Sequence, residues 1–191
     1  MNRTARHHIR AALIATAVCT GLTLAACTSS KPMASEASPT SSPDRPSVPA
    51  DPTETAKQEA IAAYQNYWQE MEKLYADRSG KAADLKKFAA SAALKNAESD
   101  AKSIHARNFI HLGGVTVNDS TVTKVEAAGK VPHAVLTSCL DISRWQVVDA
   151  TTKKPATLPS NRLTRFVITS TVERWPQGWR VIRDDPQGKR C

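Results

Sequence analysis

The 191-residue sequence lacks the short motifs that mark most common catalytic and nucleotide-binding sites. It has no G-x-S-x-G nucleophile turn, no glycine-rich phosphate-binding loop and no H-E-x-x-H zinc motif. Aromatic residues make up only 5% of the chain, and no aromatic and basic recognition motif for nucleic acid is present. The sequence therefore names no reaction, and it gives no reason to expect nucleic acid as a partner.

Histidine is too sparse to predict a metal centre. His7 and His8 lie in the N-terminal segment, and His105, His111 and His133 are spread over an expected helix, a junction and a strand. Because this spacing brings no ligands together, we expect neither a metal nor another cofactor. Solvated or structural histidines are the simpler interpretation.

The first 26 residues predict a signal peptide rather than part of the folded protein. Arg3, Arg6 and Arg10 give the segment a positive start, and 16 uncharged residues follow from Ala11 to Ala26. This stretch is shorter than the roughly 20 apolar residues that a membrane-spanning helix needs. A plain secretory signal and an uncleaved anchor are the alternatives to a lipoprotein signal.

The segment ends in Leu24-Ala25-Ala26-Cys27, which resembles the lipobox of bacterial lipoproteins. The resemblance implies that residues 1–26 are removed and that Cys27 is lipidated, with palmitate among the acyl chains. Because two acyl chains hold a protein stably at a bilayer, the membrane is the first expected partner. We therefore expect the mature protein at the outer face of the cytoplasmic membrane.

Residues 27–51 are expected to form a disordered tether that begins at the lipidated cysteine. Between residues 28 and 51 there are five prolines and seven serines, and nothing apolar enough to form a core. Such a composition cannot offset the entropy lost on ordering, and it favours an extended, polyproline-like chain. A proline-rich docking peptide is the alternative interpretation of this segment.

Residues 52–191 are then expected to form one domain.

The expected domain begins with strong helix signals. Asp51 can cap a helix, Pro52 suits its first position and Glu54 falls in its first turn. Apolar residues then recur at three- and four-residue spacing, which predicts a helix to about Ala76. A short helical turn within 82–88 and a helix from Ser91 to about residue 107 are expected next.

The period of the apolar residues changes to two after His111, which is typical of β-strands. The apolar positions of the expected strands are Val115, Val117, Val122, Val125, Ala134, Leu136, Leu140, Ile142, Phe166, Ile168, Val172, Trp179, Val181 and Ile182. Helices followed by strands predict an α+β domain, with the N-terminal helices packed on one antiparallel sheet.

Two cysteines are expected to form a disulfide. Cys19 would leave with the signal peptide and Cys27 would carry lipid, so Cys139 and Cys191 remain as an even pair in an oxidising compartment. A reactive or metal-binding thiol would require a neighbouring histidine or a C-x-x-C spacing, and this sequence has neither at these cysteines.

Three short motifs carry a resemblance to a known family. They are Cys139-Leu140-Asp141-Ile142-Ser143-Arg144-Trp145, Lys153-Lys154-Pro155 and Gly178-Trp179-Arg180-Val181. With the order of the elements, residues 52–191 resemble secreted actinobacterial-type lipoproteins that have a nuclear-transport-factor-2-like, or cystatin-like, cone domain. The resemblance implies a curved antiparallel sheet of about four strands. The family contains both enzymes and binding proteins, so it implies no activity by itself.

In enzymes of this fold, the resemblance implies a carboxylate inside the cone that works with a tyrosine or a histidine. Asp141 with Tyr64 or His133 is the one candidate catalytic set in this sequence. Against it, Asp141 alternates with Cys139 and lies near Arg144, which also fits a surface aspartate. We therefore expect binding rather than catalysis, and name no catalytic residue.

The C-terminal half carries an excess of positive charge. The whole chain has a net charge of +8, and residues 124–191 contain twelve basic and six acidic residues. This asymmetry favours an anionic partner such as a wall polymer, an acidic envelope protein or lipid headgroups. A solvated basic face is the equally simple alternative. The candidate residues are Lys153, Lys154, Arg162, Arg165, Arg174 and Arg180.

Two functional hypotheses follow from the sequence. The first is a membrane-anchored binding or interaction module that contacts another envelope component, with a homodimer through the sheet as one form of it. The second is a small-molecule site inside the cone, either a binding site or an acid-base enzyme of isomerase or dehydratase type. The second hypothesis predicts an enclosed pocket that contains an unpaired polar group.

Overall fold

A computed structural model describes residues 51–191. The predicted signal peptide, the lipobox with Cys27 and nearly all of the predicted tether lie outside the described residues, so these three remain predictions. Within the described part, no helix is both long and apolar enough to cross a membrane.

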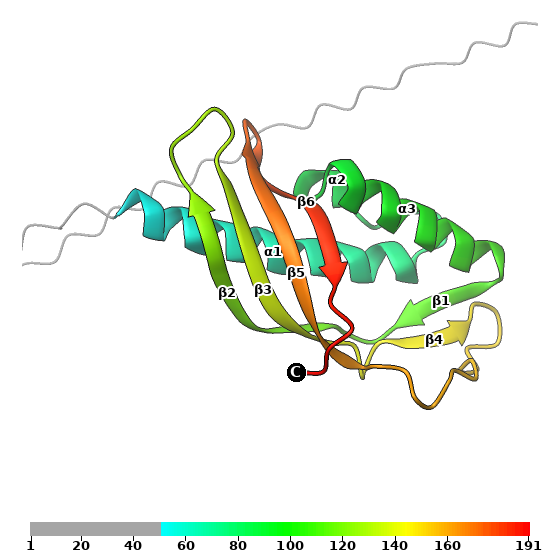
Figure 1. The fold of residues 1–191 in the computed structure, drawn as a ribbon. Helices are drawn as coiled ribbons and strands as arrows, with labels where there is room; N and C mark the ends of the chain where they lie inside the picture. Colours follow the sequence, from blue (N-terminus) through cyan, green and yellow to red (C-terminus); the bar gives the residue numbers. More distant parts are fainter. Residues whose placement is uncertain (1–50) are drawn as a thin grey trace, which may run out of the picture. The chain divides into compact units, whose positions relative to one another are not determined.

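Helices come first in the described chain and strands follow (Figure 1). The elements are α1 (Pro52–Ala76), α2 (Leu85–Phe88), α3 (Ser91–Ala106), β1 (Phe109–Leu112), β2 (Thr116–Glu126), β3 (His133–Asp141), β4 (Gln146–Asp149), β5 (Arg165–Trp175) and β6 (Gly178–Pro186). The four longer strands form one antiparallel sheet in the order β2-β3-β5-β6, and β1 pairs with β4. Figure 1 shows α1 crossing one face of the curved four-stranded sheet. The predicted α+β fold, with N-terminal helices on such a sheet, is confirmed.

Helix α1 forms where the sequence predicts it. The Asp51 side chain accepts a hydrogen bond from the Thr53 backbone N–H at 2.9 Å, which satisfies one free donor of the first turn. The buried side of the helix then faces the sheet. Its members are Ala56, Ala60, Ala63, Tyr64, Tyr67, Trp68, Glu70, Met71 and Tyr75.

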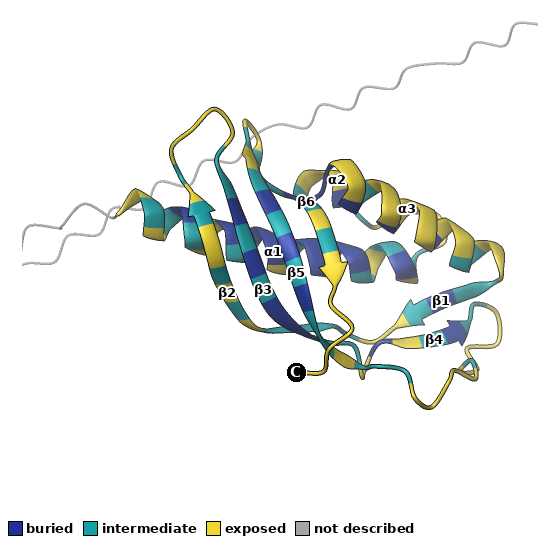
Figure 2. Ribbon diagram, in the orientation of Figure 1, coloured by how far each residue is buried: buried dark blue, intermediate teal, exposed yellow. Residues whose placement is uncertain are grey.

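Small residues let helix α3 lie close to strand β6. Ala93, Ala97 and Ala101 are buried at four-residue intervals on one side of this helix. Figure 2 shows the same division in space, with buried residues on the central strands β3 and β5 and exposed residues along the outer side of α3. The main core therefore lies between the helices and the inner face of the sheet.

Strand β6 contains a β-bulge that changes which residues face the helices. Val181 pairs with Val172, but the next step along β5 pairs Thr171 with Arg183, so β6 has one extra residue at Ile182. Beyond this point the alternation is reversed, and Asp184 lies opposite the buried Ser170. A bulge of this kind re-aims the side chains that follow it.

The sequence did not predict strand β4. The prediction that His111 lies at a junction was also wrong, because this residue lies inside strand β1. Each of these strands has four residues, which is too short to show a clear period of two. Pairing places Ile110 opposite Val148, and both side chains are buried. The small sheet therefore adds a second buried cluster beside the main core.

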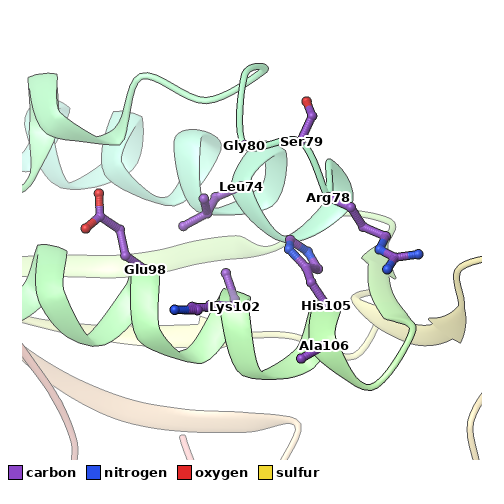
Figure 3. Close-up of a pocket in the computed structure, with 9 residues that line it drawn as sticks. Leu74, Arg78, Ser79, Gly80, Glu98, Lys102, His105 and Ala106 are labelled. Carbon is purple, nitrogen blue, oxygen red and sulfur yellow. The ribbon is translucent and has the colours of Figure 1, made fainter.

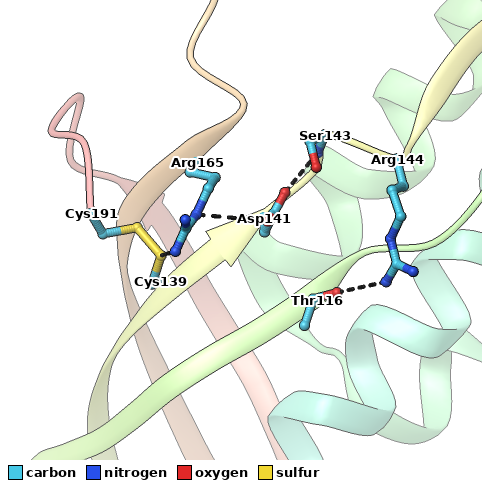
Figure 4. A network of polar contacts seen from close by, with 7 residues as sticks. All are labelled: Thr116, Cys139, Asp141, Ser143, Arg144, Arg165 and Cys191. Carbon is cyan, nitrogen blue, oxygen red and sulfur yellow. Dashed lines mark hydrogen bonds and ion pairs between the residues drawn. A yellow bond between two sulfur atoms is a disulfide. The ribbon is translucent and has the colours of Figure 1, made fainter.

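Cys139 and Cys191 form a disulfide, with their Cα atoms 5.8 Å apart. The bond ties Cys191 to the last part of β3, one of the two central strands of the sheet, across a sequence separation of 52 residues (Figure 4). This predicted pairing is confirmed.

Candidate functional site

The candidate catalytic set from the sequence does not come together in the fold. Asp141 ends strand β3 and His133 begins it, so the two lie roughly 27 Å apart at 3.4 Å per residue. Tyr64 belongs to the buried side of α1 and has no exposed surface. The three side chains therefore cannot act on one substrate atom.

Asp141 has surface partners instead. Its carboxylate accepts a hydrogen bond from the Ser143 backbone N–H at 2.9 Å and lies 3.6 Å from the Arg165 guanidinium (Figure 4). The hydrogen bonds from Ser143, followed by the charges of Arg165 and Arg144, lower the pKa of Asp141. A carboxylate held ionised in this way is poorly suited to serve as a general base near neutral pH.

A cavity lies between the helices α1 and α3 and the strands β3, β5 and β6. Its volume is about 330 Å³. This size falls within the range of sites that hold a small organic molecule. Five aromatic side chains line it: Phe166 and four that contact one another as a wall, Tyr67, Trp68, Tyr75 and Trp145.

The aromatic rings of this wall meet nearly at right angles. The Tyr67 and Trp68 rings have centroids 5.6 Å apart and planes at 74°, and Trp68 and Trp145 are 6.1 Å apart at 85°. Tyr75 closes the series against Trp145 at 5.0 Å and 65°. Edge-to-face pairs of this kind hold each ring in a fixed orientation, and the change of ring plane from one residue to the next makes the wall curved.

Two carboxylates, Asp184 and Asp100, are the charged groups of the cavity lining within the described residues. Asp184 lies on β6 after the bulge, and its carboxylate accepts a hydrogen bond from the Ser170 hydroxyl at 2.5 Å. Burial of the carboxyl group raises the pKa of Asp184 to about 7, although the Ser170 hydrogen bond acts in the opposite direction. Asp184 therefore changes its charge near neutral pH.

Several polar atoms around the cavity lack partners within residues 51–191. The Nε1 atoms of Trp68 and Trp145 are buried without a hydrogen-bond acceptor, and both side chains are more than nine-tenths buried. The Tyr64 hydroxyl has no hydrogen bond of good geometry, but it lies close enough to Ser170, Trp68 and Asp184 for all three to affect its pKa. Unpaired buried polar atoms are costly, and they concentrate at sites where something else can bind.

The negative charges of the two carboxylates affect the pKa values of the tyrosines in the wall. Burial raises the pKa of Tyr67, and the nearby charges of Asp184 and Asp100 raise it further. Burial and the Asp100 charge also raise the pKa of Tyr75. Both tyrosines therefore stay neutral, and both lie in the field of negative charge.

His111 extends the aromatic cluster behind this wall. Its ring lies 4.2 Å from the Trp145 ring and 5.1 Å from the Tyr75 ring, and neither ring nitrogen has a hydrogen-bond partner in the described residues. Burial lowers the pKa of His111 to about 4, with smaller effects of His105 and Arg162. The imidazole is therefore neutral at physiological pH.

A larger groove, of about 500 Å³, lies between the end of α1 and helix α3 (Figure 3). Two of its polar side chains already have partners, because Arg78 donates to the Asn108 side chain at 2.8 Å and His105 Nε2 lies 3.2 Å from the Tyr75 carbonyl. Exposed groups of both signs, Glu98 and Lys102, border it. The smaller cavity is therefore the better candidate, in spite of its size.

The candidate basic residues do not form one surface. Lys153 and Lys154 lie in the loop after β4, and Arg165 begins strand β5. Arg174 lies near the other end of β5, roughly 30 Å from Arg165. Arg180 follows in β6, where its guanidinium stacks over the Trp175 ring at 5.1 Å, and Arg162 is partly buried in the loop before β5.

Sequence reasoning missed Asp184 and Ser170. One signal for Ser170 was present, because it follows Phe166 and Ile168 at the spacing of an inward-facing position and precedes Val172. The position of Asp184 had no such signal. Strict alternation from Trp179 and Val181 would place Arg183 inward and Asp184 outward.

The comparisons with known proteins leave the function open. No protein-family model matches the chain, and no curated protein sequence matches it. Among solved structures, the intermembrane space region of the chloroplast protein ARC6 is similar, with a TM-score of 0.46 and 16% sequence identity. The match covers 66% of this chain and 95% of that one.

Proposed function

We propose that this chain is a lipid-anchored, extracytoplasmic binding protein that takes up a small molecule in the cavity between α1, α3 and the sheet. One observation carries the proposal: a cavity of about 330 Å³ whose wall consists of ordered aromatic rings and includes buried polar atoms without partners. A merely structural core would be expected to fill such a space and to pair those atoms.

The location of the protein is part of the same proposal. The lipobox-like sequence at Cys27 supports an anchor in the membrane, and the Cys139–Cys191 disulfide suits an oxidising compartment outside the cytoplasm. Similarity to secreted lipoproteins with a cone domain supports the same assignment. Mass spectrometry of the N-terminal peptide should show acyl chains on Cys27 of the wild type and none on a Cys27→Ala variant. An unmodified Cys27 in the mature wild type would reject the lipid anchor.

Native mass spectrometry of the full chain, purified in a neutral detergent, tests the cavity. We expect a retained small molecule in the wild type and its loss in Asn96→Trp, because Asn96 is an exposed residue of α3 that borders the cavity. Ser99→Trp is the matched control, since Ser99 is exposed on the same helix but does not line the cavity. Equal retention in both variants would reject the cavity as the binding site.

Acid-base catalysis in the same cavity is the second candidate function. The position of Asp184 favours it, because a carboxyl group with a pKa of about 7 can exchange a proton at neutral pH. Once a ligand is known, mass spectrometry should detect its conversion by the wild type and not by Asp184→Asn. Unchanged ligand after prolonged incubation would leave binding alone.

An envelope protein or an anionic wall polymer as partner, and a homodimer through the sheet, remain separate predictions. Cross-linking on intact cells, with Cys27→Ala as the control, tests them. Capture of a specific protein or polymer that is lost in the variant would support an envelope partner. A cross-link between two copies of this chain would support the homodimer.

A further inference from the structure

The charged part of the cavity lining has one sign. Among the described residues, Asp100 on α3 and Asp184 on β6 line the cavity, and no lysine or arginine does. Both carboxylates influence Tyr67, and Asp100 also influences Tyr75, so their negative fields overlap at the aromatic wall. A positive charge placed there would be stabilised from two sides.

The aromatic wall supplies the second half of a cation site. Tyr67, Trp68 and Trp145 are each more than nine-tenths buried, and successive rings stand at 74° and 85° to one another. Because the three rings line the cavity at steep angles to one another, a cation in it would lie beside aromatic groups on more than one side, as in the aromatic cages that bind methylated ammonium groups. The wall is therefore preorganised, and little ordering would be needed on binding.

We propose that the cavity binds a small organic ammonium ion, with its charge between Asp100 and Asp184 and its alkyl groups against Tyr67, Trp68 and Trp145. This inference rests on the proposed function, because it names the class of ligand for the same cavity. An anionic ligand would meet two carboxylates without a compensating cation. A neutral ligand would gain no electrostatic stabilisation from the two carboxylates.

Proton binding should compete with the ligand. The groups that face Asp184 are Tyr64 and Tyr67 from α1, Ser170 from β5, Asp100 across the cavity on α3 and the neighbouring Asp185 on β6. None of them carries a positive charge, so a bound ammonium ion would favour the ionised form of Asp184. Affinity for the cation should then fall as the pH drops from 8 to 6.

Choline and its neutral carbon isostere, 3,3-dimethylbutan-1-ol, form the critical pair of probes, and butylammonium with butan-1-ol forms a second pair. Binding to the full chain in a neutral detergent is followed by tryptophan fluorescence, which reports on Trp68 and Trp145 in the wall. We expect at least one cation to bind about tenfold or more tightly than its neutral partner. The advantage should decrease in Asp184→Asn.

Glu98→Gln is the control variant, because Glu98 is an exposed carboxylate on α3 that lines the other groove. It should keep the full preference for the cation. Equal binding of cation and neutral isostere would overturn the ammonium assignment but leave a small-molecule site. Failure of every cation to bind in the millimolar range would also overturn it. The native mass spectrometry described above then decides separately whether the cavity binds a small molecule at all.

Discussion

The Ser170 hydroxyl on β5 donates a hydrogen bond to the Asp184 carboxylate on β6 at 2.5 Å, directly across the pair of strands. This contact exists because the bulge at Ile182 turns Asp184 toward the helices. It places a titratable group with a pKa of about 7 at the edge of an aromatic cavity. The first prediction follows from this pair.

Asp184 should make the protein less stable as the pH rises from about 4 to about 7. Its pKa is raised from 3.8 to about 7 in the folded state, so the folded form holds a proton that the unfolded form releases over that range. Compared with Asp184→Asn, the wild type should therefore lose free energy of unfolding across this window and remain level above it. Urea unfolding at pH 4, 5, 6, 7 and 8 measures the difference.

Asp185→Asn is the control for this series, because Asp185 is the exposed neighbour of Asp184 on the same strand. The charge of Asp185 makes only the smallest contribution to the raised pKa of Asp184, so this variant should keep the same pH dependence as the wild type, shifted slightly to lower pH. A difference between the wild type and Asp184→Asn that does not vary with pH would contradict the raised pKa.

His111 should have the opposite effect at acid pH. Its pKa is lowered from 6.5 to about 4, so the unfolded chain binds a proton before the folded chain does. Stability is then complete above about pH 6.5 and falls toward pH 4. At pH 5 His111→Phe should be more stable than the wild type by about 1 to 2 kcal/mol.

At pH 7.5 the same variant should be equal to the wild type or slightly more stable, because phenylalanine removes two buried nitrogens that have no partner. Paired thermal or urea unfolding at pH 5 and 7.5 tests both statements. If His111→Phe instead lowered the free energy of unfolding more at pH 5 than at pH 7.5, His111 would be protonated in the folded protein.

Gly113 should not tolerate a side chain. Its φ is +92°, and a Cβ atom at this position would lie 1.9 Å from the Arg144 carbonyl oxygen. The neighbouring backbone cannot move away cheaply, because Trp145 follows in the aromatic wall. Gly113→Ala should therefore lower the free energy of unfolding by about 2 to 4 kcal/mol.

Gly80→Ala provides the comparison, since Gly80 also has a positive φ, of 68°, but has open space where the Cβ would lie. This variant isolates the cost of the backbone conformation, about 1 kcal/mol. Equal costs in the two variants would mean that the Arg144 carbonyl does not restrict Gly113.

The disulfide should contribute about 4 kcal/mol to stability, because it closes a loop with a sequence separation of 52 residues. The double variant Cys139→Ala, Cys191→Ala removes it without leaving a free thiol in the described domain. Urea unfolding of this variant and of the wild type, each with and without reductant, gives the difference. Reductant should affect only the wild type, and a change of less than about 1 kcal/mol would refute the estimate.

The sequence was sufficient to predict the helices and the four-stranded sheet. Asp51, Pro52 and the spacing of apolar residues locate α1 because capping and amphipathicity are local properties. Cys139 and Cys191 could be paired by elimination. The short strands β1 and β4 could not be separated from loops, because four residues contain too little periodicity.

The cavity could not be predicted, because it depends on residues far apart in the chain. Asp141 stands out in the sequence but lies at the surface beside Arg165, whereas strict alternation along β6 would place Asp184 outward. A bulge is decided by how two strands pair, and one strand alone carries little sign of it. The partners of Trp68 and Trp145 are likewise set by tertiary packing.

Helix α1 also has a mechanical consequence for a protein attached through its N-terminal side. The helix starts at Pro52, where the predicted tether ends, and Tyr67 in the aromatic wall lies roughly 22 Å further along its axis at 1.5 Å per residue. That offset is rigid, because it is set by backbone hydrogen bonds. The helix therefore fixes the distance between the cavity and the end of the predicted tether, whatever the length of that tether.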